Sequence, residues 1–125
     1  VAVTNILGGN LGWNLSATTT TTLMTVAAEK IVKINRITVA NVDGAAAADV
    51  SLFVDGLTTA GATGISPTGA SATVYLAKTI SVPADATLVI SDTPIYLMEG
   101  DILKGGASAA SDLDLFISYE VLDDA

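Results

Sequence analysis

Apolar and polar positions alternate most clearly near the end of the chain, in residues 112–122 (DLDLFISYEVL). Every second position in this segment is apolar, and the set is Leu113, Leu115, Ile117, Tyr119 and Val121. Most of the positions between them are acidic or hydroxylated. A period of two residues puts the apolar set on one face of an extended chain. The pattern therefore predicts a β-strand with one buried face.

A second long segment, residues 31–42 (IVKINRITVANV), is rich in β-branched residues but changes its parity halfway. Val32 and Ile34 share one parity, whereas Ile37 and Val39 share the other. A β-bulge inserts one extra residue into a strand and so moves the later side chains to the opposite face. We expect a strand that is interrupted by a bulge, or one that is partly covered on both faces.

Similar patterns predict further strands, separated by turn residues and by a long loop over residues 57–72. The expected strands cover residues 18–26, 31–42, 49–56, 73–82, 86–91 and 112–122, with a short hairpin around Gly100-Asp101. No segment has the periodicity of a helix. The fold class is therefore all-β, an antiparallel β-sandwich. The spacing of the strands leaves open whether the connections are those of a jelly roll or of an immunoglobulin-like sandwich.

The first segment, residues 1–17, has weak periodicity and contains Gly8, Gly9, Gly12 and Trp13. Gly-Gly and Gly-Asn steps are typical of loops. We expect an extended N-terminal arm over residues 1–17, followed by a single β-sandwich domain over residues 18–125. Removal of residues 1–16 should then leave the sandwich folded.

Composition excludes several classes of chemistry. The 125 residues contain neither Cys nor His, and 13 acidic residues outweigh 5 basic ones to give a net charge of −8. We expect no disulfide, no metal, no cofactor and no catalysis that depends on histidine, and hence not an enzyme. An acidic surface repels phosphate, so we expect neither nucleic acid nor an anionic membrane as a partner.

Two acidic residues, Asp112 and Asp114, lie on one face of the last expected strand. Paired carboxylates of this kind could form half of a calcium site or the acid pair of a glycosidase. They are also typical of a solvated strand whose charges discourage pairing with other strands. We interpret them in this second way. Asp43, Asp49 and Asp55 lie too far apart for a calcium loop of the form Asp-x-Asp-x-Asp-Gly, and we interpret them as turn residues.

Charge is missing from two long stretches, residues 1–28 and residues 56–77. The first stretch carries apolar residues instead, and these are Ile6, Leu7, Leu11, Trp13 and Leu15. Depletion of charge around an aromatic residue is typical of the centre of a protein interface. We expect these five residues to contact a partner, although they could instead fold back onto their own sandwich.

The segment AKTISVPADATLVISDTPIYLMEGDILKGGASAASDLDLFISYEVL, residues 77–122, resembles small structural proteins of tailed bacteriophage virions, as does the earlier VKINRITVANVDG. The resemblance covers residues 30–122. It implies a β-sandwich that acts in virion assembly. The expected function is that of a capsid cement or decoration protein, which binds the major capsid protein at the capsid surface after synthesis in the host cytoplasm. A component of the tail, neck or fibre is the alternative, and a homo-oligomer, such as a trimer, is expected in either case.

A carbohydrate-binding module on the same kind of sandwich is a weaker alternative. Such a module needs exposed aromatic rings that stack on sugars. The chain has only six aromatic residues, and they are scattered along the sequence.

Overall fold

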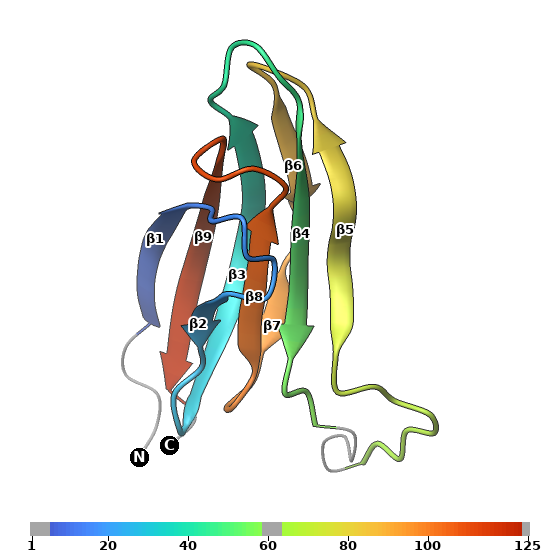
Figure 1. Cartoon of the computed structure of the whole chain (residues 1–125). Helices are drawn as coiled ribbons and strands as arrows, with labels where there is room; N and C mark the ends of the chain where they lie inside the picture. The colour runs from blue at the N-terminus through green and yellow to red at the C-terminus, as the bar shows by residue number, and fades with distance from the viewer. Residues whose placement is uncertain (1–5, 59–63, 124–125) are drawn as a thin grey trace.

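The computed structural model describes residues 6–58 and 64–123, which form nine β-strands and contain no helix (Figure 1). The strands are β1 (Ile6–Asn14), β2 (Thr22–Thr25), β3 (Lys30–Asn41), β4 (Ala48–Asp55), β5 (Val74–Val82), β6 (Thr87–Ser91), β7 (Ile95–Leu97), β8 (Ile102–Ala107) and β9 (Leu113–Asp123). They build two antiparallel sheets that pack face to face.

One sheet has the order β1-β9-β3-β6, and β7 also pairs with β3. The other sheet has the order β2-β8-β4-β5. β6 pairs with Ile37–Ala40 of β3 and β7 pairs with Val32–Ile34, so β6 and β7 follow one another along the same edge. They are in effect one strand that is interrupted before Pro94, a residue that cannot donate to a sheet ladder.

The pairing of strands is nested. β1 pairs with β9, β2 with β8, β3 with β6 and β7, and β4 with β5. The chain therefore folds like one long hairpin that is rolled up, with most connections crossing from one sheet to the other. This is the jelly-roll arrangement. It decides between the two kinds of sandwich that the strand spacing left open.

The core lies between the sheets and confirms the two clearest sequence patterns. Leu113, Leu115 and Ile117 of β9 are buried, as their alternation predicts. In β3 the register against β9 shifts between Ile34 and Arg36, and Ile34 and Ile37 are both fully buried. The extra residue of this bulge is Asn35, which explains the change of parity in the sequence.

The expected arm over residues 1–17 is not confirmed. Residues 6–14 form β1, which pairs with β9 over nine consecutive residue pairs without a register shift. Residues 1–5 lie outside the described part of the chain. The glycines that break the hydrophobic period of this segment do not prevent it from pairing, because the ladder uses only backbone groups.

The predicted strand over residues 18–26 is also shorter in the structure, where only β2 is regular. Residues 16–21 instead run along the part of β8 that extends past β2, with hydrogen bonds from the Ala107 N–H to the Ser16 carbonyl (2.9 Å) and from the Gly105 N–H to the Thr21 carbonyl (3.0 Å). A Cβ on Gly106 would clash with the Thr18 carbonyl. The absence of a side chain at this glycine therefore lets Thr18 and Thr19 lie directly against the backbone of β8.

The predicted hairpin around Gly100-Asp101 is wrong, because β7 and β8 belong to different sheets. Asp101 is buried at the turn between them, where its Oδ2 accepts the Met98 N–H at 2.8 Å and its own N–H donates to the Met98 carbonyl at 3.0 Å. The turn signal is real, but it carries the chain from one sheet to the other.

Candidate functional site

The structure separates the five residues that were expected to contact a partner. Leu15 is 2% exposed and belongs to the core, and Trp13 is partly buried against the same core. The assignment of Leu15 is corrected, because its side chain is packed inside the chain's own sandwich. Trp13 is only partly buried, so its expected contact with a partner stays a prediction. Leu7 and Leu11 are 64% and 37% exposed on the same strand. The Ile6 side chain lies outside the described part of the structure.

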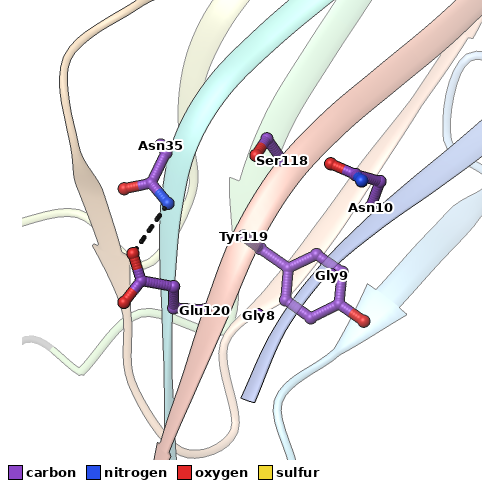
Figure 2. Close-up of a pocket in the computed structure, with 7 residues that line it drawn as sticks. All are labelled: Gly8, Gly9, Asn10, Asn35, Ser118, Tyr119 and Glu120. Carbon is purple, nitrogen blue, oxygen red and sulfur yellow. Dashed lines mark hydrogen bonds between the residues drawn. The ribbon is translucent and has the colours of Figure 1, made fainter. Parts of the chain in front are cut away.

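A polar hollow of about 440 Å³ lies where β1, β9 and the β3 bulge meet (Figure 2). Its lining consists of Gly8, Gly9, Asn10, Asn35, Ser118, Tyr119 and Glu120. The Asn35 amide donates to Oε1 of Glu120 at 3.1 Å. The hollow exists because two neighbouring positions of β1 have no side chain and because the bulge turns Asn35 toward β9.

The loop between β4 and β5, residues 56–73, lies within the second charge-free stretch of the sequence, residues 56–77. Its described residues, 56–58 and 64–73, project from the end of the sandwich opposite to the loops that join β3 to β4 and β5 to β6 (Figure 1). In its described residues Ile65 is 60% exposed, and Gly64 and Gly69 have φ angles of +90° and +75°. Glycine adopts these angles at little cost, which allows sharp reversals of the backbone.

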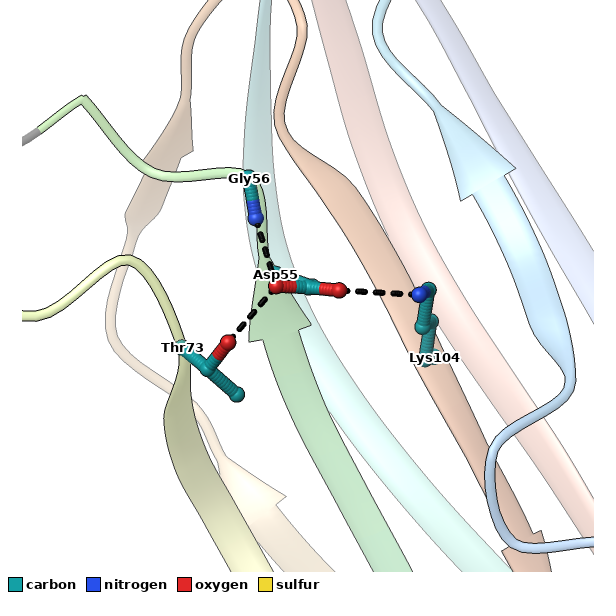
Figure 3. Close-up of polar contacts among 4 residues, drawn as sticks. All are labelled: Asp55, Gly56, Thr73 and Lys104. Carbon is teal, nitrogen blue, oxygen red and sulfur yellow. Dashed lines mark hydrogen bonds and ion pairs between the residues drawn. The ribbon is translucent and has the colours of Figure 1, made fainter.

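The base of this loop is held closed by Asp55, the last residue of β4 (Figure 3). Its Oδ1 accepts hydrogen bonds from the Thr73 hydroxyl at 2.6 Å and from the Gly56 N–H at 2.9 Å. Its Oδ2 forms an ion pair with Lys104 Nζ of β8 at 2.8 Å. The Leu57 N–H also donates to the Ala72 carbonyl at 3.0 Å.

The polar contacts of Asp55 all favour its ionised form. The hydrogen bond from Lys104, followed by those from Thr73 and Gly56, lowers the pKa of the Asp55 carboxyl from its usual 3.8 to about 2. Hydrogen bonds to a carboxylate stabilise the charged state and so lower its pKa. The carboxylate is therefore charged at neutral pH and acts as a fixed clamp.

An aromatic pair lies beside the clamp on the outer face of the β2-β8-β4-β5 sheet. The rings of Phe53 and Tyr75 are 4.9 Å apart between centroids, and Lys78 Nζ lies 5.2 Å from the centroid of the Tyr75 ring. Phe53 is buried by this packing, whereas Tyr75 stays half exposed. Sequence reasoning missed this pair because its members lie on different strands and only the register brings them together.

The opposite end of the sandwich is acidic. The loops that join β3 to β4, β5 to β6, and β8 to β9 meet there and carry Asp43, Asp85 and Asp112, without a Lys or Arg among residues 42–47, 83–86 and 108–112. The Asp85 N–H donates to the Asp43 carbonyl at 3.3 Å, and the Val42 N–H donates to the Asp112 carbonyl at 2.8 Å. The β4–β5 loop at the other end carries no charge, although the turns beside its base carry Glu29 and Glu99.

The acidic residues do not assemble into a metal site within the described residues, where no group of three or more potential ligands is found. Asp114, one of the two residues considered for calcium or glycosidase chemistry, accepts a hydrogen bond of 2.7 Å from the Asn14 amide instead. β9 is also an inner strand, so the expectation that these acidic residues discourage pairing at a sheet edge is wrong. Residues 6–58 and 64–123 contain no helix long and apolar enough to span a membrane.

Comparison of the chain with protein-family models, curated proteins and solved structures returned no match.

Proposed function

We propose that the chain is a structural protein of a virion, a capsid decoration or cement protein that binds the major capsid protein and stabilises the head. The observation that carries the proposal is the uncharged β4–β5 loop, which projects on a clamped base at the end away from the acidic loops. An adhesive loop on a rigid jelly roll is suited to bridging subunits of a shell. The resemblance of residues 30–122 to virion proteins supports the same role.

The charge distribution supports one orientation on the capsid. The β4–β5 loop faces the capsid, and the acidic end with Asp43, Asp85 and Asp112 faces solvent. Like charges on the outer surface keep particles dispersed, whereas an uncharged contact costs little desolvation. Burial of apolar surface contributes about 25 cal/mol per Å². Even a small contact of this kind is significant when it is repeated over a whole shell.

The exposed side chain of Ile65 provides the test. Full burial of such a side chain contributes about 1.5–3 kcal/mol, so Ile65→Ser should weaken binding to capsids that lack the protein by roughly tenfold or more. Val42→Ser is the matched control, because Val42 is 54% exposed beside the acidic loops. Cosedimentation with purified capsids measures both variants. Equal binding by wild type and both variants would contradict the docking surface.

The same experiment separates the alternative positions in a virion. Labelled protein that binds isolated tails, necks or fibres, and not heads, would replace the cement assignment with one of those positions. Failure to bind any particle component would remove the virion proposal altogether.

The polar hollow favours a carbohydrate-binding module as a second candidate. It offers amide, hydroxyl and carboxylate groups, and the half-exposed Phe116 lies two residues before Ser118 on β9. Sugars are held by such polar groups together with aromatic stacking. A glycan array tests this, and Glu120→Gln should remove any binding that it finds, whereas Ile65→Ser should not change it. An array without signal would exclude the candidate.

A further inference from the structure

The four edges of the two sheets are protected very unequally. β2 is only four residues long, β5 has register shifts and a Thr79 φ of +48°, and the β6–β7 edge is broken before Pro94. β1 has nine residues, an unshifted register, no proline and no charged residue. Natural sheets protect their edges with short strands, bulges, prolines and charges. β1 lacks all four of these devices.

The phase of the β1 ladder shows which backbone groups remain available. The Leu15 N–H donates to the Leu113 carbonyl at 2.8 Å, and the register of β1 against β9 continues this pairing without a shift. Hydrogen-bonded pairs alternate along an antiparallel ladder. The odd-numbered residues of β1 therefore bond to β9. The N–H and C=O groups of Gly8, Asn10 and Gly12 point away from it, toward the open edge.

We propose that β1 pairs with β1 of a second copy of the chain, antiparallel about a two-fold axis at Asn10. Asn10 is the central residue of β1, so this is the one register that uses the whole strand. It joins Gly8 to Gly12 of the second copy and Asn10 to itself through their outward-pointing backbone groups. The two jelly rolls then share one continuous sheet across an isologous interface.

The side chains of β1 fit this register. Leu11 lies opposite Gly9 of the second copy, and Leu7 lies opposite Trp13, so that each large side chain meets either a glycine or an apolar ring. A side chain at Gly9 would collide with the Tyr119 hydroxyl, which lies 2.8 Å from the ideal Cβ position. The pairing covers Leu7 and Leu11, which are exposed among the described side chains of the five residues expected to contact a partner.

The net charge of the chain favours a second copy as the partner of the β1 edge. Each chain carries a net charge of −8, and two like-charged proteins associate most easily through a surface that bears no charge. β1 is such a surface. It also lies at the opposite side of the sandwich from β5 and the β4–β5 loop (Figure 1). The pairing therefore leaves the β4–β5 loop free and does not depend on the proposed function.

Cysteine cross-linking tests the register directly, because the natural chain has no Cys. Residues that exchange both hydrogen bonds in an antiparallel pair have Cα atoms about 5.5 Å apart, which is within the range that a disulfide spans. Under mild oxidation Asn10→Cys should become a covalent dimer of twice the 12.6 kDa chain mass. Val89→Cys, a half-exposed position on the β6 edge, should stay monomeric.

Analytical ultracentrifugation of the untagged chain provides the second measurement. The wild type should sediment as a dimer at high concentration. Leu11→Lys should shift it to a folded monomer, whereas Val89→Lys should not. A monomer at all concentrations, a trimer, or cross-linking of Val89→Cys as readily as Asn10→Cys would overturn the proposal. If Leu11→Lys does not fold, the cross-linking result decides.

Discussion

The Thr73 hydroxyl lies 2.6 Å from Oδ1 of Asp55, and this hydrogen bond joins the two ends of the β4–β5 loop. The same carboxylate holds Gly56 and Lys104, so one side chain connects the loop to both β4 and β8. Removal of the carboxylate should therefore loosen the loop without disturbing the core.

Asp55→Asn should increase the rate of proteolytic cleavage within residues 57–72 severalfold, with little change in the melting temperature. Cleavage of a native protein requires local opening, and the clamp opposes that opening. Limited proteolysis with mass detection measures the rate. Asp92→Asn, which removes the same charge from the exposed turn between β6 and β7, should cleave like the wild type. Equal cleavage of all three proteins would show that the clamp is not what restrains the loop.

The clamp should depend on pH in a defined direction. Because the folded protein lowers the pKa of Asp55 from 3.8 to about 2, the stabilisation is fully present above pH 3.8 and is lost as the pH falls through about 2. An NMR titration of the Asp55 carboxyl carbon should have its midpoint near 2. Lys104→Met should move the midpoint upward toward 3.8, whereas Lys78→Met, which removes the same charge elsewhere, should not.

The packing of β8 against β4 requires a glycine at position 105. A Cβ there would collide with the Ser51 carbonyl and would also lie 3.2 Å from the Leu52 Cα. These are backbone atoms, so relief requires the strands to move apart. Gly105→Ala should cost about 1–3 kcal/mol in urea unfolding. Gly12→Ala, where the nearest atoms are at 3.7 and 3.8 Å, should be neutral or slightly stabilising.

Local patterns in the sequence predict the local features of this fold. The alternation in β9 predicts its buried face, and the change of parity in β3 allows a bulge as one of two explanations, which the structure places at Asn35. The strand expected over residues 49–56 also agrees closely with β4, which ends at Asp55. Each of these features depends on residues that are close together in the sequence.

Features that depend on distant pairing could not be predicted. The partner strand of β1 is β9, which lies at the other end of the chain, and the glycines of β1 erase the periodicity that would reveal a strand. The turn at Asp101 is visible in the sequence, but the sheet that receives β8 is not. The contacts of Asp55 could not be predicted for the same reason, because Thr73 and Lys104 lie 18 and 49 residues from it in the sequence.

Substitution of Leu15 tests whether residues 6–15 are part of the folded sandwich. Leu15 is almost fully buried, so Leu15→Ala should cost about 2–5 kcal/mol in the free energy of unfolding, whereas Leu7→Ala should change it by less than about 0.5 kcal/mol at low chain concentration. Urea denaturation followed by Trp13 fluorescence measures both. Deletion of residues 1–16 should likewise unfold the chain, because it removes Leu15 and leaves the ladder edge of β9 unpaired. A stable, folded deletion variant would support the interpretation of residues 1–17 as an arm. It would also show that β1 contributes little to the stability of the sandwich.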